Sequence, residues 1–234
     1  MNEPTFSGIS RRAACRRLLG LAGGASLVMP WLGSVQPVIG ADEAIGNTMR
    51  IEEDWYIKIG APDPEADSPQ ITTVLAPSWS LDGSFAVFAL TCATQPGFSA
   101  GGLQLQLWYN GAITQTCSNT NWDSLHFMEE EIRYTSAVSV QNGNIIYEIL
   151  NGTSTTWGTF GTGELILQRP TWRSQLNGYS PDCSAQNSRI GFASHRVRDF
   201  RLDRVRYYFE NNNGLHLQST DETPRVVFHY APQA

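Results

Sequence analysis

The chain has 234 residues, of which 41% are hydrophobic and 11% aromatic, a composition that excludes disorder over most of its length. Only 16% of the residues are charged, against about 25% in a typical globular protein. The net charge of −6 excludes a general nucleic-acid binder, because such a protein needs a basic surface that displaces counterions from phosphates.

A basic segment followed by a short apolar stretch opens the chain. Residues 10–17 read Ser-Arg-Arg-Ala-Ala-Cys-Arg-Arg, and the apolar stretch over 18–32 is shorter than the roughly 20 residues that span a bilayer. These features predict a signal peptide over residues 1–41 that is cleaved on export. The arginine pair resembles a twin-arginine translocation signal, with Ala13 and Ala14 where that pattern favours Phe and Leu. An ordinary secretory signal and a retained membrane anchor are the alternatives.

The mature protein is expected in the periplasm or outside the cell, without a membrane segment. Removing residues 1–41 takes away four arginines and one glutamate, which changes the net charge from −6 to −9. We expect residues 42–49 to be flexible and residues 50–234 to form a single domain. An oxidising destination allows one disulfide among Cys92, Cys117 and Cys183, and all three pairings are open.

Short segments of alternating polar and apolar residues predict strands throughout the mature chain. In 51–59 the apolar Ile51, Trp55, Ile57 and Ile59 alternate with polar residues, and in 103–108 three leucines do the same. Asn-Gly and Asp-Gly pairs, which suit type I′ turns, stand at 82–83, 110–111, 142–143, 151–152, 177–178 and 213–214. The other predicted strands are 71–76, 84–92, 112–117, 132–140, 144–151, 164–168, 189–193, 199–209 and 225–230. About eleven strands without a convincing helix predict an all-β fold, a two-sheet antiparallel β-sandwich.

An acidic, proline-rich segment at 62–69 is the clearest predicted loop. Asp63, Glu65 and Asp67 place oxygen ligands at the spacing used early in calcium loops. The segment lacks the glycine at the sixth position and the closing glutamate of such a loop, where Ser68 and Val74 stand. A solvated acidic loop and a calcium site are the two interpretations, and no other metal or cofactor is expected.

Two segments near the C-terminus carry a resemblance to a known fold family. Residues 189–192 read Arg-Ile-Gly-Phe, and residues 200–208 read Phe-Arg-Leu-Asp-Arg-Val-Arg-Tyr-Tyr. Both are similar to the closing strands of concanavalin A-like and laminin-G-like jelly rolls. The resemblance implies two curved antiparallel sheets, with any ligand on the concave face or at the loop rim. Phe200 and Leu202 have the opposite parity to Val205, which predicts a bulge near Asp203.

Catalytic motifs known from enzymes of this fold are absent from the sequence. The Glu-x-Asp-x-x-Glu pattern of retaining glucanases, which sets two carboxyl groups about 5 Å apart, does not occur. Residues 52–54 read Glu-Glu-Asp without the third carboxylate, and Thr72 stands where jelly-roll lyases carry a histidine. We therefore expect a non-catalytic protein, with a polysaccharide lyase or glycosidase of degenerate motifs as the alternative.

Two polar strand faces are the candidate ligand-binding surface. Amide and aromatic side chains share one face of 103–108, and guanidinium and phenol groups share the polar face of 199–209. If both strands belong to the concave sheet, they form a shallow groove of planar hydrogen-bonding groups beside an aromatic platform, which suits a sugar. The candidate residues are Gln104, Gln106, Trp108, Arg204, Arg206 and Tyr208. Ordinary solvated outer surface is the alternative interpretation.

Six tryptophans belong to the mature chain, and most are expected in the core of the sandwich. Trp122, Trp157 and Trp172 fall in predicted loops, where one or two of them could contact a ligand at the rim. The sequence therefore predicts an exported protein that binds a polysaccharide or another cell-envelope component. A structural or interaction subunit of an envelope assembly is the remaining alternative.

Overall fold

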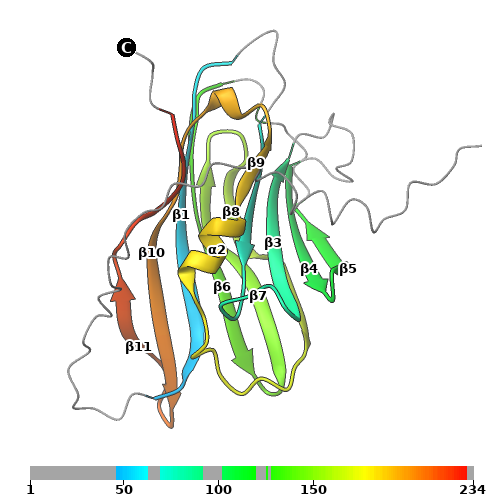
Figure 1. Ribbon diagram of the computed structural model, residues 1–234, viewed down its shortest axis with the longest axis vertical. Helices are drawn as coiled ribbons and strands as arrows, with labels where there is room; N and C mark the ends of the chain where they lie inside the picture. Colours follow the sequence, from blue (N-terminus) through cyan, green and yellow to red (C-terminus); the bar gives the residue numbers. More distant parts are fainter. Residues whose placement is uncertain (1–45, 63–68, 92–101, 120–124, 126–127, 231–234) are drawn as a thin grey trace, which may run out of the picture. The chain divides into compact units, whose positions relative to one another are not determined.

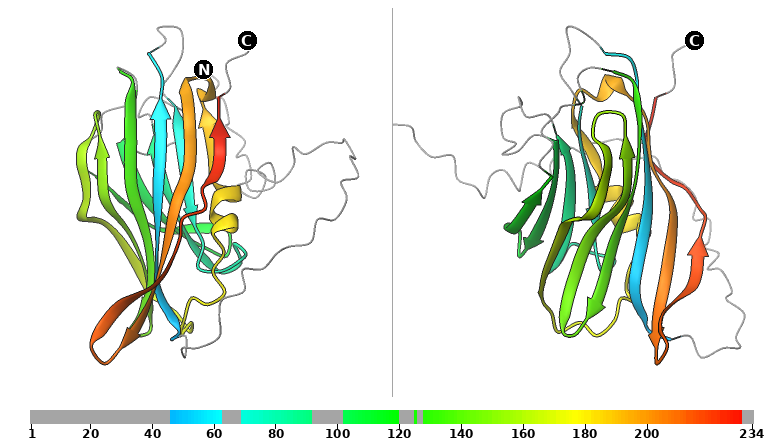
Figure 2. Two further views of the ribbon diagram at one scale, coloured as in Figure 1. Left: turned by 90° about the vertical axis from the view of Figure 1, so that its left-hand side faces the viewer. Right: turned by 180° about the vertical axis from the view of Figure 1, so that it is seen from behind.

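Two antiparallel sheets packed face to face make up the fold of the computed structural model (Figures 1 and 2). The structure describes residues 46–62, 69–91, 102–119, 125 and 128–230. The larger sheet has seven strands, in the order β11 (Gly214–Asp221), β10 (Val197–Asn211), β1 (Thr48–Ile59), β6 (Glu130–Gln141), β7 (Asn144–Ser154) and β8 (Gly158–Pro170), with β12 (Arg225–His229) also paired to β10. The smaller sheet has five, in the order β5 (Ala112–Ser118), β4 (Gly102–Tyr109), β3 (Ser84–Thr91), β2 (Gln70–Leu75) and β9 (Arg189–Phe192).

The predicted all-β, two-sheet antiparallel sandwich is confirmed, and its arrangement is compatible with a jelly roll. Two elements were not predicted. The edge strand β11 leaves Leu215 and Leu217 exposed, so it contributes no buried apolar face. The helix α2 (Pro181–Asn187) has seven residues, too few to show a 3.6-residue period, although a proline opens its first turn. A 3₁₀ turn, η1 (Ser194–Arg196), connects β9 to β10.

The core lies between the sheets and follows the predicted alternation. Ile51, Trp55, Ile57 and Ile59 on β1 are all buried. Aromatic rings join the two layers, as in the edge-to-face contact of Phe88 on β3 with Tyr134 on β6, whose centroids are 5.0 Å apart. Full burial of one such aliphatic side chain stabilises the fold by about 1.5–3 kcal/mol. This alternation also turns the polar residues of β1 toward the outer face.

The Asn-Gly pairs serve two different purposes. At 110–111 and 142–143 both residues have positive φ, and these pairs close the β4–β5 and β6–β7 hairpins as predicted. The pair at 151–152 was wrongly predicted as a turn, because it lies within β7 at a register shift against β6. Asn151 takes a φ of 52° there, so a left-handed residue accommodates a bulge inside the strand.

The start of the domain and two of the three cysteines lie within the described residues. The first strand begins at Thr48, two residues before the expected start of the domain, and the Thr48 carbonyl accepts a hydrogen bond of 2.7 Å from the Leu176 amide. Cys117 and Cys183 both carry free thiols. Cys92, the signal segment 1–41 and the calcium candidates Asp63, Glu65 and Asp67 lie outside the described residues.

Candidate functional site

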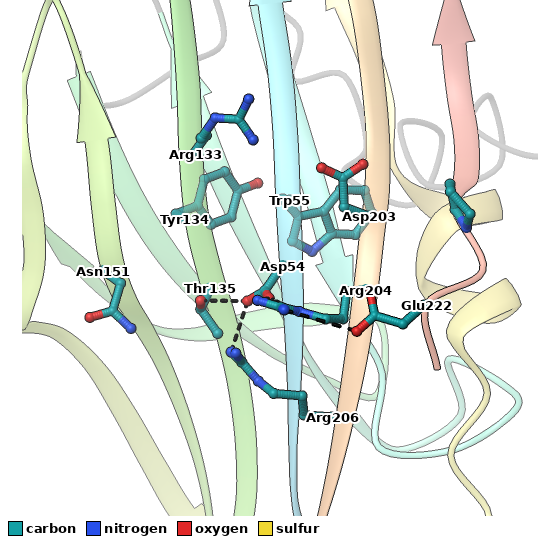
Figure 3. A pocket seen from close by; sticks show the side chains of 11 residues that line it. Asp54, Trp55, Arg133, Tyr134, Thr135, Asn151, Asp203, Arg204, Arg206 and Glu222 are labelled. Atoms are coloured by element: carbon teal, nitrogen blue, oxygen red, sulfur yellow. Dashed lines mark hydrogen bonds and ion pairs between the residues drawn. The ribbon is translucent and has the colours of Figure 1, made fainter. Parts of the chain in front are cut away.

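A polar depression of about 620 Å³ lies on the outer face of the seven-stranded sheet. Figure 3 shows its side chains rising from β1, β6, β7 and β10, with one more contribution from the segment between β11 and β12. Its lining residues are Asp54, Trp55, Arg133, Tyr134, Thr135, Asn151, Asp203, Arg204, Arg206, Glu222 and Pro224. Because Trp55 and Tyr134 belong to the buried core, the polar residues are the ones that a ligand would meet.

A bulge in β10 directs the arginines of this site outward. The β1–β10 register pairs Arg204 with Asp54 but Leu202 with the next residue, Trp55, so Asp203 is the extra residue on β10. The predicted bulge near Asp203 is thus confirmed, and Leu202 and Val205 are both fully buried. Arg204 consequently lies directly beside a carboxylate of β1.

Asp54 is the centre of the hydrogen-bond network in the depression. Its Oδ2 accepts from Arg204 Nε at 2.7 Å and lies 2.6 Å from Arg204 Nη2. Its Oδ1 accepts from Arg206 Nη2 at 2.9 Å and from Thr135 Oγ1 at 2.7 Å. Four donor atoms from three residues occupy all the acceptor positions of this carboxylate. Asp54 therefore fixes the two guanidinium groups, and its hydrogen bond and charge raise the pKa of Arg204.

The network continues along the same face through Glu52. This carboxylate accepts a hydrogen bond from the Tyr208 hydroxyl at 2.9 Å and lies 3.0 Å from Arg206 Nη2. Arg50 donates from Nε to Glu52 Oε1 at 2.9 Å and from Nη2 to Oε2 of Glu148 on β7 at 3.3 Å. Arg204 and Arg206 of β10 thus pair across strands with the carboxylates of β1, whereas Arg201 pairs with Asp199 and Asp203 of its own strand. Charge-assisted bonds on adjacent strands hold this face in one arrangement.

The Tyr56 ring contacts two guanidinium groups, one of which, that of Arg133, lines the depression. The guanidinium carbons of Arg133 and Arg201 each lie 4.3 Å from the ring centroid of Tyr56. Cation–π contacts of this kind contribute about 0.5–1 kcal/mol at exposed sites. Arg133 Nη2 also lies 3.4 Å from Glu131 Oε2 in an ion pair. The upper end of the depression is therefore ordered as well.

The charges around the depression balance. Three arginines, Arg133, Arg204 and Arg206, face three carboxylates, those of Asp54, Asp203 and Glu222. The Asn151 amide makes no hydrogen bond to another described residue, so it keeps hydrogen-bonding capacity for a ligand. The Nε of Arg206 also has no partner, but it is buried beneath the surface of the depression. Such a site suits a neutral ligand that both donates and accepts hydrogen bonds.

The structure divides the six candidate residues between the two sheets. Arg204, Arg206 and Tyr208 lie on the outer face of β10, as described above. Gln104, Gln106 and Trp108 lie on the outer face of β4 in the five-stranded sheet. The outer faces of a sandwich point in opposite directions, so the single groove that would combine both sets does not form.

The β4 residues are bonded mainly to one another. Gln106 donates to Gln104 Oε1 at 2.7 Å, and the Trp108 indole donates to Gln106 Oε1 at 3.1 Å. The Trp108 ring is stacked on Phe85 with centroids 5.9 Å apart. A role of these three residues in binding stays a prediction, but much of their hydrogen-bonding capacity is already used.

Sequence reasoning did not identify Asp54, Thr135 and Asn151 as site residues. Alternation along β1 was sufficient to turn Asp54 outward, whereas nothing local indicates that its partners are Arg204 and Arg206. Thr135 reaches the site because β6 pairs with β1 at this register. Asn151 arrives through the β7 bulge.

Comparison with known proteins finds no protein family that matches the chain and no curated protein that matches it. Within the described ranges, no three His, Cys, Asp or Glu side chains are grouped so that they could hold a metal ion. The helices in that part of the chain include none that is long and apolar enough to cross a membrane.

Proposed function

We propose that this protein is an exported, non-catalytic carbohydrate-binding β-sandwich, and that the depression on the seven-stranded sheet binds a neutral polysaccharide. The basic and apolar N-terminal segment supports export. The observation that carries the binding proposal is the pair of guanidinium groups, Arg204 and Arg206, fixed by Asp54 in a depression whose charges balance.

The chemistry of a sugar matches these groups. Each ring offers neighbouring hydroxyls that donate and accept at once. The site offers guanidinium N–H donors, the carboxylate acceptors of Asp203 and Glu222, and the Asn151 amide. Balanced charges remove the attraction that a polyanion would need, so a neutral glycan is favoured over an acidic one. The volume of about 620 Å³ lies within the usual range of about 300–1,000 Å³ for ligand sites. Because the side chains are already ordered, little conformational entropy is lost on binding.

Two substitutions test the site without unfolding the sheet. Asn151→Gly removes the amide and keeps a residue that tolerates positive φ, while Arg206→Lys keeps the charge but removes the planar guanidinium group. Loss of one hydrogen bond to a ligand is expected to weaken binding about tenfold. The matched control is Asn110→Gly, because Asn110 has nearly the same φ, 50° against 52°, in the β4–β5 turn of the other sheet.

Binding is measured by calorimetry of the purified protein with neutral glucan, mannan and xylan oligosaccharides, and with alginate and heparin fragments as acidic comparisons. We expect neutral ligands to bind, both site variants to bind about tenfold more weakly and Asn110→Gly to bind normally. Equal affinity in all three variants would remove the depression as the site. A preference for acidic ligands would contradict the charge argument, and release of shortened products would contradict the non-catalytic part of the proposal.

A further inference from the structure

Two tryptophans at one end of the sandwich are largely exposed to solvent. Trp172 is 90% exposed in the segment between β8 and α2, and Trp79 is 74% exposed in the loop between β2 and β3. Both segments lie at the end of the sandwich that also carries the β6–β7 turn (Figure 1). Covering a large aromatic side chain removes apolar surface from water and lowers the free energy. Two such side chains exposed at one end therefore indicate a contact surface.

Hydrogen bonds hold the two loops in place. Arg173, which follows Trp172, donates from its guanidinium to Ser78 Oγ at 3.4 Å, and Ser78 precedes Trp79. On the other side of Trp172, the Thr171 amide donates to the Gly143 carbonyl at 2.8 Å. The exposed indole of Trp172 is therefore flanked by two anchored residues. A backbone held on both sides keeps the loop from losing much conformational entropy when a ligand covers the ring.

A hollow of about 350 Å³ lies beside Trp172. Its polar lining includes Gln141, Asn142, Thr171 and Ser174, together with one cation, Arg173, and one anion, Glu210. An exposed aromatic face next to amides, hydroxyls and a balanced charge pair presents both parts of a sugar-binding surface, because a sugar ring has an apolar C–H face and a polar rim. An anionic lipid surface would require a basic cluster, which the Arg173–Glu210 balance does not supply.

The hollow and the depression are connected along one strand, β10. Glu210 of the hollow and Arg206 of the depression both belong to β10 and lie four residues apart on the same face of the strand, whereas Met49 of the hollow packs against the core. With a rise of about 3.3 Å per residue, Arg206 and Glu210 are about 13 Å apart along β10. One extended oligosaccharide spans that distance.

From these observations we infer a second saccharide-binding site, formed by Trp172 over the hollow at the loop end, with Trp79 as a neighbouring stacking surface. The inference rests on the proposed function for its ligand class. Trp172 provides the stacking surface, while the Asn142 amide and the Arg173 guanidinium provide hydrogen bonds to the rim of the sugar.

The test uses tryptophan fluorescence and calorimetry of the purified protein with cellohexaose, mannohexaose and laminarihexaose. We expect a hexasaccharide to shift the emission and to protect it from acrylamide quenching. Trp172→Ala should weaken binding at least about tenfold, and Trp172→Tyr should restore most of it, because a tyrosine ring still stacks. Since the side chain is 90% exposed, Trp172→Ala should leave the unfolding midpoint unchanged.

The Asn151→Gly variant separates this inference from the proposed function. If Asn151→Gly weakens binding and Trp172→Ala does not, the loop-end site is wrong and the depression stands. If Trp172→Ala weakens binding and Asn151→Gly does not, the loop-end site stands and the depression is wrong. Absence of hexasaccharide binding by the unaltered protein overturns both. Trp172-dependent binding to phosphatidylglycerol vesicles in place of sugars overturns the saccharide assignment.

Discussion

The buried carboxyl group of Glu53 is predicted to make the stability of the fold depend on pH. Glu53 faces the interior of the sandwich and is 0% exposed. The Trp55 indole donates to Glu53 Oε2 at 3.0 Å, and the Tyr179 hydroxyl donates to Oε1 at 2.6 Å. Burial raises the pKa of Glu53 to about 7, although these donors and the hydroxyl of Ser184 lower it in part.

The direction of the effect follows from proton binding. In the unfolded chain the carboxyl group has its ordinary pKa of 4.5, so the folded protein binds one proton more between pH 4.5 and about 7. The stabilisation by Glu53 is therefore complete below pH 4.5 and is lost as the pH rises through about 7. At about 1.4 kcal/mol per pKa unit, the loss amounts to about 3 kcal/mol.

Urea unfolding of the unaltered protein and of Glu53→Gln at pH 5, 6, 7 and 8 measures this loss. Glutamine is neutral at every pH, and its carbonyl oxygen still accepts from Trp55 while its amide group faces the Tyr179 hydroxyl, which can accept. Other titrating groups, such as Asp221 with its lowered pKa, are common to both proteins and cancel in the difference. We expect Glu53→Gln to be relatively more stable at pH 8 than at pH 5 by about 3 kcal/mol. Parallel pH profiles of the two proteins would refute the reasoning.

Three further predictions concern the stability of the fold. Arg196 is 1% exposed and donates to four backbone carbonyls, so Arg196→Met should lower the free energy of unfolding in urea by about 3 kcal/mol or more. Both Gly161 and Gly163 have positive φ, so alanine is strained at either position. Gly161→Ala should lower the melting temperature more than Gly163→Ala, because only at Gly161 would the new Cβ meet the carbonyl oxygen of Ile149, at 2.6 Å. Asp54→Asn should cost about 1–3 kcal/mol in urea unfolding and leave the circular dichroism of the sheet unchanged, since it removes the charge that fixes two arginines.

Local patterns in the sequence determine which face a side chain takes. The alternation along β1 and β4 places Ile51, Leu103 and their neighbours inside, and the change of parity between Leu202 and Val205 locates the bulge of β10. These predictions succeed because a strand has a period of two, so a single buried residue fixes the orientation of the rest. Glu53 could have been found in the same way, since it has the parity of Ile51.

The choice of sheet has no comparable local signal. Gln104 and Arg204 have equally good polar faces, and only long-range pairing places β4 beside β3 and β10 beside β1. Asp54 and Arg204 are 150 positions apart in the chain. The partner that converts Asp54 from a solvated carboxylate into the centre of a network is therefore visible only in the folded structure.

The two proposed contact surfaces differ in the physical source of their binding energy. In the depression the ligand would meet polar groups that Asp54 has already ordered, so this surface favours discrimination among hydroxyl arrangements and gains little from burial of apolar area. At the loop end, covering Trp172 removes a large aromatic surface from water, which favours affinity with little selectivity. Because both surfaces are reached along β10, a chain bound at one is held at high effective concentration near the other. A long polymer then gains from both surfaces, whereas a short oligosaccharide gains from only one, so the arrangement favours polysaccharides over free sugars.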